Sequence, residues 1–275
     1  MQIFDCHVHT TCSFDGKATA EEQCVRGAEL SLCGITLTDH NYPTPEPFAH
    51  GEHIKASCEN ARRLSEAYKG KLLVMSGVEV ADIFLDGCDN QPIYDAKPDF
   101  ILGSVHSSAI FRKYFPNEKI TTLLRNGDKI TLDFARRFTE RYLLEMLKTA
   151  ESADVDALAH LTYPLRYING DGKLGLSASE FSGITDEIFK TAIKREIAIE
   201  VNTSGYATGW NECMPPKELL CRYYQLGGRR ITLGSDSHAT HTLSVGIPEA
   251  MDMLKEIGFT HANYYVQRSA REYKL

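Results

Sequence analysis

Short apolar, β-rich segments recur along this chain, and helical patterns lie between most of them. We expect strands at Gln2–His7, Gly34–Asp39, Leu72–Val78, Phe100–Val105, Ala157–His160, Ala198–Asn202 and Arg230–Gly234. We expect helices at Ala20–Cys33, His53–Tyr68, Leu132–Ser152, Glu180–Lys194, Pro216–Gln225 and Ile247–Ile257. Thr19 with Glu22, and Ser177 with Glu180, fit the capping box that begins a helix. Strands that alternate with helices predict a parallel sheet covered by helices.

One barrel-like domain is the simplest arrangement of these elements. The chain has 275 residues, of which 43% are hydrophobic, and this size is normal for a single α/β barrel. No linker, low-complexity tract or internal repeat divides the sequence, so we expect one domain over residues 1–275. An open doubly wound sheet is the alternative. The phosphate loop GxxxxGK[ST] is absent, and the one GxGxxG, at Gly170–Gly175, does not directly follow an expected strand, so neither motif supports a nucleotide-binding version of it.

The charge balance and the cysteines limit the partners and the compartment. Lys and Arg number 30 and Asp and Glu 37, a net charge of −7, which argues against a nucleic-acid or anionic-membrane partner. The sequence shows no signal-like leader and no apolar run long enough to cross a membrane. Its eight cysteines are scattered and form no CxxC pair, as expected for reduced thiols. These features predict a soluble cytoplasmic protein.

Potential metal ligands stand at the C-terminal ends of six of the seven expected strands. Strand by strand they are His7 and His9, Asp39 and His40, Glu79, His106, His160, and Asp236 with His238. Alternate residues of a strand share a face, so Asp5, His7 and His9 are expected to point the same way. The C-terminal ends of parallel barrel strands form the mouth where active sites lie. The repeated position therefore predicts a metal site at this mouth.

The number of candidate ligands indicates more than one ion. The candidates are His7, His9, Asp15, His40, Glu79, His106, His160, Asp236 and His238. A single structural zinc takes four ligands, so two or three divalent ions are implied. Glu79, the only glutamate at a strand end, is the expected bridge between ions. Histidine and carboxylate ligands without cysteine suit Zn²⁺, Mn²⁺ or Fe.

Other histidines and one long connection are more ambiguous. His50, His53 and His261 lie in loop or helix settings and are expected to be ordinary residues, whereas His241 is near enough to the mouth to take part. The connection from Ser107 to Ile130 contains five basic residues against two acidic ones. It either attracts an anionic substrate to the mouth or forms a solvated surface loop.

Six ordered motifs resemble those of the PHP (polymerase and histidinol phosphatase) superfamily. They are DCHVHTTCSFDG, ITLTDHN, GVEV, GSVH, LAH and GSDSH, and the match runs from residue 2 to about residue 260. Within this superfamily, the chain length, KPDFILGSVH and EVNTSG resemble the stand-alone histidinol-phosphate phosphatases of histidine biosynthesis. GSVHSSAIF and SDSH differ from the GSVHF-like continuation and the SDAH ending that are common in that group, and the first difference touches a loop that we expect to influence which substrate is selected.

This resemblance implies a distorted (β/α)7 barrel with a trinuclear metal site. Carried onto this sequence, it implies a first ion at His7, His9, Glu79 and Asp236, a second at Glu79, His106 and His160, and a third at Asp15, His40 and His238. The strand-end pattern leads to the same residues except Asp15, which could otherwise be a plain turn residue before Gly16.

The implied activity is hydrolysis of L-histidinol phosphate to L-histidinol and phosphate. Clustered ions lower the pKa of water and neutralise phosphate oxygens. Asp236 and His238 are the nearest candidates to assist the leaving alkoxide. Arg166, in HLTYPLRY after the fifth strand, is expected to bind phosphate with its planar fork, or else to pair with Asp171 on the surface.

Two other functions remain open at this stage. The first is a PHP phosphoesterase for another small phosphate, such as a nucleotide or a sugar phosphate. The second, of a different class, is a non-catalytic metal-binding barrel, although a closed structural site would need fewer ligands. A nuclease is disfavoured because the chain is acidic.

Overall fold

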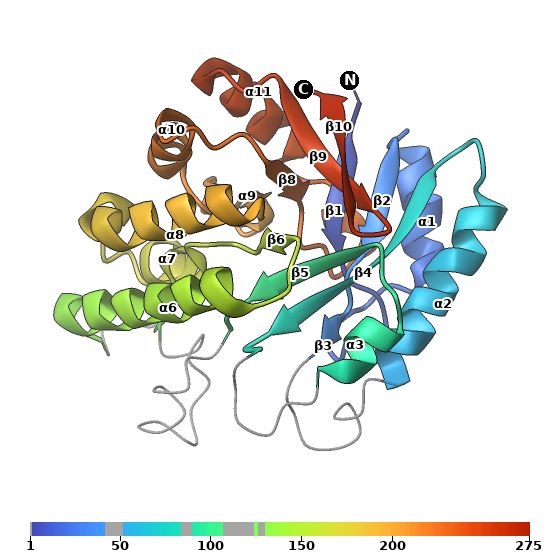
Figure 1. Cartoon of the computed structure of the whole chain (residues 1–275), viewed down its shortest axis with the longest axis horizontal. Helices are drawn as coiled ribbons and strands as arrows, with labels where there is room; N and C mark the ends of the chain where they lie inside the picture. Colours follow the sequence, from blue (N-terminus) through green and yellow to red (C-terminus); the bar gives the residue numbers. More distant parts are fainter. Residues whose placement is uncertain (1, 42–51, 84–89, 107–123, 126–129) are drawn as a thin grey trace.

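Seven parallel strands follow one another around a barrel (Figure 1). The computed structural model describes residues 2–41, 52–83, 90–106, 124–125 and 130–275. The barrel strands, in spatial order, are β1 (Phe4–Val8), β2 (Gly34–Leu37), β4 (Leu73–Ala81), β5 (Phe100–Ser104), β6 (Ala157–Leu158), β7 (Ala198–Asn202) and β8 (Ile231–Gly234). All seven expected strands are confirmed, with small shifts at their ends. Apart from Leu73 in β4, every residue of these strands is buried, which explains their nearly continuous apolar sequences.

The last strand returns to the first, so the sheet is a barrel and not the open alternative. The His9 amide donates to the Ser237 carbonyl at 2.8 Å, and the Ser237 amide donates to the His7 carbonyl at 3.3 Å. The barrel is distorted, because the pairing of β1 with β2 shifts in register between Asp5 and Val8. A short extra strand, β3 (His40–Asn41), pairs with β4 and places His40 directly opposite Glu79.

Helices cover the outside of the barrel (Figure 1). The longer ones are α1 (Ala20–Glu29), α2 (Glu52–Ala67), α6 (Leu132–Ser152), α8 (Ser182–Arg195), α10 (Lys217–Gln225) and α11 (Ile247–Ile257). Short turns of helix are α3 (Gln91–Asp95), α7 (Tyr163–Leu165), η2 (Arg166–Asp171), η3 (Ala178–Phe181), α9 (Ser204–Ala207) and η4 (Thr240–Thr242). All six expected helices are confirmed. Within the described part of the chain, no helix is both long and apolar enough to cross a lipid bilayer.

Only one of the two expected capping boxes forms. Thr19 and Glu22 cap α1 reciprocally, as predicted. The second prediction is wrong in detail: the Ser177 side chain accepts from the Ser179 amide and begins η3, while the Glu180 carboxylate accepts from Arg136 at 2.6 Å. Because Glu180 binds another helix, α8 begins two residues later than expected.

A C-terminal hairpin closes the barrel at the end opposite its mouth. It consists of β9 (His261–Val266) and β10 (Ser269–Lys274), which pair antiparallel across the strand starts near both chain termini (Figure 1). The Phe4 ring stacks on Tyr264 with ring centroids 4.3 Å apart, and the Asn263 side-chain oxygen accepts from the Ile231 amide at 3.2 Å. These contacts leave the other end of the barrel for the site.

Candidate functional site

All nine candidate ligands meet at the C-terminal ends of the strands. β1 and the residues after it supply His7, His9 and Asp15, β3 and β4 supply His40 and Glu79, and the segments after β5, β6 and β8 supply the remaining four: His106, His160, Asp236 and His238. Parallel strand ends converge at one mouth, so residues more than 200 positions apart come into contact here.

The Glu79 carboxylate lies between two pairs of histidines. Its Oε2 atom is 3.3 Å from His7 Nε2 and 3.5 Å from His9 Nε2. Its Oε1 atom is 2.9 Å from His160 Nε2 and 3.1 Å from His106 Nε2. The side chain is completely buried, and Oε2 also lies 2.7 Å from His40 Nδ1. A fully buried carboxylate surrounded by imidazole nitrogens is suited to a cation, because a buried charge is costly unless it is paired.

A first group of four ligand atoms lies around Glu79 Oε2. The Nε2 atoms of His7 and His9 are 3.0 Å apart. Asp236 Oδ1 lies 3.3 Å from His9 Nε2 and 3.6 Å from His7 Nε2. Two imidazole nitrogens and two carboxylate oxygens thus converge, and this is a ligand set that divalent transition metals accept.

The second group lies on the other side of Glu79. His106 Nε2 and His160 Nε2 are 3.1 Å apart, and both face Glu79 Oε1. His160 has a positive φ of 24°, and Asp236 in the first group has a φ of 54°. Non-glycine residues with such backbone angles are strained and cluster at functional sites.

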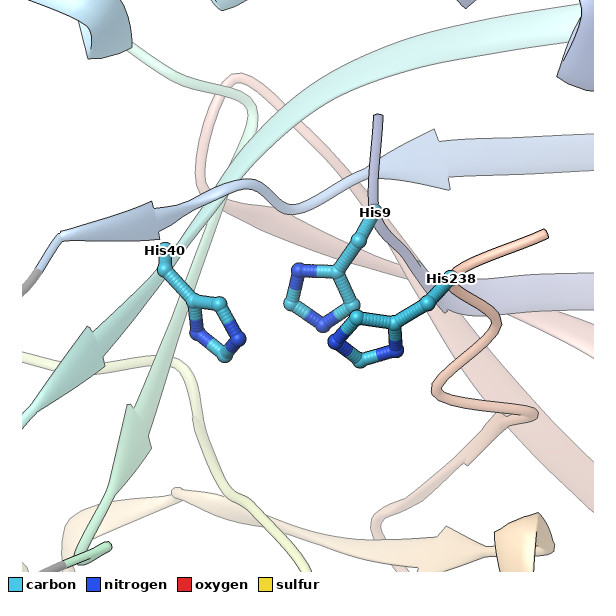
Figure 2. Close-up of side chains that lie close together, drawn as sticks. All are labelled: His9, His40 and His238. Atoms are coloured by element: carbon cyan, nitrogen blue, oxygen red, sulfur yellow. The ribbon is translucent and has the colours of Figure 1, made fainter. Parts of the chain in front are cut away.

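The third group joins Asp15 to two histidines. Asp15 Oδ2 is 3.3 Å from His238 Nε2 and 3.6 Å from His40 Nε2. Figure 2 shows the rings of His9, His40 and His238 lying close together, and one ligand atom from each lies within 4.8 Å of the others. Because His9 also belongs to the first group, the first and third groups are adjacent.

Burial and the opposing charges shift the pKa values of these groups strongly. Burial alone would raise the pKa of Glu79, but His106, His40 and His7 hold it well below its usual range. Burial alone would lower the pKa of His40, yet Glu79 and Asp15 raise it to about 10. Burial and the neighbouring histidines His40 and His238 lower the pKa of His9 well below its usual range. The metal-free site therefore balances anionic carboxylates against protonated and neutral imidazoles.

We expect zinc binding to this site to release protons. At neutral pH the metal-free protein holds His40 as an imidazolium, because its pKa is about 10. As a candidate ligand, His40 would have to lose one proton to bind zinc through Nε2, so zinc affinity should rise as the pH rises toward 10. Calorimetric titration in buffers of different ionisation enthalpy measures the released protons. A binding enthalpy independent of the buffer would contradict this expectation.

Two buried carboxylates support the histidines: Asp39, which was expected from the sequence as a potential metal ligand at a strand end, and Glu200, whose role was not predicted. Asp39 accepts from the Thr10 amide at 2.7 Å and from Ser13 Oγ at 2.7 Å, and Ser13 Oγ lies 3.2 Å from His9 Nδ1. Glu200 Oε1 lies 2.6 Å from His7 Nδ1. The available signal was a charged residue inside an apolar strand or at its end: Asp39 in TLTDH and Glu200 in AIEVN.

Asp5 shares the expected face of β1 but does not reach the cluster. Its carboxylate accepts from the Ser235 amide and hydroxyl at 2.9 and 2.5 Å, and from the Ser244 amide at 3.0 Å. The expected convergence of three groups on this strand is therefore correct for His7 and His9 only. The thiol of Cys6, which lies between Asp5 and His7 on this strand, donates to the Asn263 carbonyl at 3.7 Å.

Arg166 lies beside the cluster and is more buried than a surface residue. Its side chain is 13% exposed, Nη1 donates to Ser204 Oγ at 2.5 Å, and Nη1 lies 3.9 Å from Asp236 Oδ2. Nη2 donates to the Tyr167 hydroxyl, and Nε is buried without a hydrogen bond to any residue that the structure describes. Asp171, the alternative partner, pairs instead with Arg125 at 3.0 Å.

The remaining histidines have different positions. His53 Nε2 lies 2.8 Å from the His40 carbonyl, so it supports the strand that carries a candidate ligand. His241 is exposed on η4, and His261 is exposed at the start of β9. His50 and most of the basic connection, including Arg112, Lys113, Lys119 and Lys129, lie outside the described residues.

The parallel barrel with histidines and carboxylates at its mouth defines a PHP-type barrel. The sequence profile of the PHP domain matches residues 5–204, and this chain belongs to the PHP domain family. A protein of Clostridium acetobutylicum named "Probable histidinol-phosphatase" is 31% identical over 257 residues, covering 91% of this chain and 92% of that protein. A protein of Thermotoga maritima with the same name is 27% identical and covers 94% of each chain.

A solved structure also shares the fold. It is the crystal structure of histidinol phosphate phosphatase from Lactococcus lactis complexed with zinc, L-histidinol and phosphate. The two structures superpose with a TM-score of 0.76, at 22% sequence identity, over 98% of each chain. This similarity confirms the expected (β/α)7 barrel of the PHP type.

Proposed function

We propose that this protein is a metal-dependent phosphatase that hydrolyses L-histidinol phosphate to L-histidinol and phosphate in histidine biosynthesis. The observation that carries the proposal is the division of nine buried or half-buried ligands into three groups around Glu79, at the mouth of a PHP barrel. Relatives named as histidinol-phosphatases match over almost the whole chain. We also propose that residues 1–275 act as one cytoplasmic domain on a small phosphorylated substrate, without nucleic acid or membrane as a partner.

We propose that two or three ions of Zn, Mn or Fe occupy the three groups. The first would be held by His7, His9, Glu79 and Asp236, the second by Glu79, His106 and His160, and the third by Asp15, His40 and His238. The buried Glu79 carboxylate, with imidazole nitrogens close to both of its oxygens, fits such ions. When bound, the ions activate water as a nucleophile and offset the charge of the phosphoryl group. Zinc is present in the Lactococcus lactis structure of the same fold.

The residues of this chain would position the ester around the ions. Arg166 is proposed to bind phosphate oxygens, because its guanidinium lies beside Asp236 and, among the described residues, its Nε has no hydrogen-bond partner. Asp236 and His238 remain the proposed groups that assist the leaving alkoxide. Asp236 Oδ1 faces His9, whereas Oδ2 faces Arg166 and accepts from the Asn202 side-chain amide at 3.4 Å. The neighbouring histidines hold the pKa of this carboxyl well below its usual range, so Asp236 would assist as an anion. His238 Nδ1 lies 2.9 Å from the Asp236 carbonyl and Nε2 faces Asp15, which favours a ligand role for His238.

Steady-state hydrolysis of a small panel of phosphate esters tests this function. The panel contains L-histidinol phosphate, phosphoserine, a nucleoside monophosphate and a sugar phosphate, each assayed with zinc and with a chelator. We expect kcat/KM for L-histidinol phosphate to exceed the others by at least about a hundredfold and to vanish with the chelator. Faster hydrolysis of the nucleotide or the sugar phosphate would show that this ester, and not L-histidinol phosphate, is the preferred substrate. A zinc-loaded protein that hydrolyses none of the esters would be a non-catalytic barrel.

A further inference from the structure

We propose that Glu200 is a positioning residue that holds one histidine of the first ligand group and one of the second in register for metal binding. This inference rests on the metal site of the proposed function. Glu200 lies in the middle of β7 and is only 1% exposed. Its Oε1 lies 2.6 Å from His7 Nδ1, and its Oε2 accepts from the His160 amide at 2.7 Å. One side chain thereby joins β1, β7 and the segment after β6.

A carboxylate is the side chain that this position requires. The amide of His160 is always a donor, so Oε2 has to be an acceptor. If Oε1 also accepts, His7 carries its proton on Nδ1, and the lone pair on Nε2 faces Glu79 and Asp236. Glutamine has one acceptor and one donor group at the same places. It can satisfy His160 or the metal-binding tautomer of His7, but not both.

The surrounding structure is built for this contact. A Cβ atom on Gly234 of β8 would lie 2.5 Å from Glu200 Oε1 and 2.5 Å from His7 Cβ, so glycine is what allows the two side chains to approach. The Asn202 side-chain amide donates to Glu200 Oε2 at 3.2 Å. The bond from His160 also restrains a residue whose φ is 24°, an unfavourable angle for a side chain.

The third ligand group has other supports. His238 Nδ1 lies 2.9 Å from the Asp236 carbonyl, and the His40 amide donates to Ser13 Oγ at 3.0 Å. Loss of Glu200 should therefore weaken the first and second groups together and spare the third. Partners of metal-ligating histidines typically change metal affinity by about 10- to 100-fold when they are replaced.

Zinc binding to Glu200→Gln, measured by chelator competition on the full chain, tests this pattern. We expect two zinc ions to bind about 10- to 100-fold more weakly than in the unaltered protein, with a third ion retained. Asp156→Asn is the matched control. Asp156 is also a buried carboxylate, and it accepts a hydrogen bond from the Ile101 amide of a neighbouring strand at 2.7 Å. It lies at the opposite end of the barrel from the ligand cluster. Unchanged affinity in Glu200→Gln, or an equal loss in Asp156→Asn, would overturn the proposal.

The His7 tautomer gives a second readout that a merely structural role would not change. In zinc-loaded protein labelled with ¹⁵N-histidine, the His7 signals should show Nδ1 protonated and Nε2 unprotonated, and Glu200→Gln should shift them. This measurement on the unaltered protein decides the matter even if the variant does not fold, because a proton on Nε2 would contradict the proposal. Neither readout depends on turnover. If the protein binds zinc but does not hydrolyse L-histidinol phosphate, the proposed function fails and the role of Glu200 is still tested.

Discussion

Replacing Glu79 by glutamine should remove metal and activity together. Its two carboxylate oxygens face different histidine pairs, with Oε2 3.3 Å from His7 Nε2 and Oε1 2.9 Å from His160 Nε2. Glutamine is neutral and offers one acceptor oxygen, so both groups lose an anionic ligand and one of them loses its acceptor atom as well. Metal activation of water and phosphate is worth several kcal/mol. A loss of about 4 kcal/mol corresponds to roughly a thousandfold decrease in kcat/KM.

Elemental analysis and kinetics on the same folded preparation check this result. Asp156→Asn, which changes a buried carboxylate away from the mouth, is the control and should keep both metal and activity. If Glu79 serves only as a buried partner of histidines, its loss should lower the free energy of unfolding without altering how much metal the folded protein holds. Full metal content in Glu79→Gln would therefore exclude the bridging role.

The barrel could be predicted because its strands repeat one sequence pattern. The C-terminal hairpin has almost no sequence pattern that predicts it. Each barrel strand is a short apolar segment next to a helical pattern. The hairpin turns at Gln267 and Arg268, which have φ angles of 50° and 61°. Two-residue turns with positive φ usually contain Asn-Gly or a similar pair, and this sequence does not. β9 is recognisable only from its packing against Phe4 and β8.

The candidate ligands could be predicted because parallel strands bring their C-terminal ends together. The alternation of side chains along a strand predicts which face each side chain points to. It does not predict how far along the barrel axis that side chain lies from the mouth. Asp5 is therefore expected on the same face as His7, yet its carboxylate accepts a hydrogen bond from Ser235 and does not reach the ligand cluster. Glu200 lies in the middle of an apolar strand, and its role depends on a glycine of the next strand, Gly234, that leaves room for it. Such a contact between distant residues has no local sequence pattern.

Replacing Arg166 should impair turnover while leaving metal content unchanged. The guanidinium lies over the rings of Tyr163 and Tyr167, at 5.2 and 4.8 Å from their centroids, and this stacking aims it toward Asp236. A hydrogen bond to a charged group is worth about 1.5–3 kcal/mol. Arg166→Ala should therefore decrease kcat/KM by roughly ten- to a hundredfold. Arg166→Lys should already decrease it, because lysine cannot form the paired hydrogen bonds of the planar fork.

The measurement has to separate lost phosphate binding from lost structure. Arg166 also donates to Ser204 and Tyr167, so its removal could loosen the segment after β6. Thermal unfolding and zinc content of both variants should accompany the kinetics. Arg136→Ala is the control for the lost charge, because Arg136 is half-exposed on α6 and pairs with Glu180 at 2.6 Å. If Arg166→Ala has unaltered kinetics, phosphate is held by the metal ions alone. If only Arg166→Ala among these variants loses inhibition by free phosphate, the guanidinium binds the phosphoryl oxygens directly.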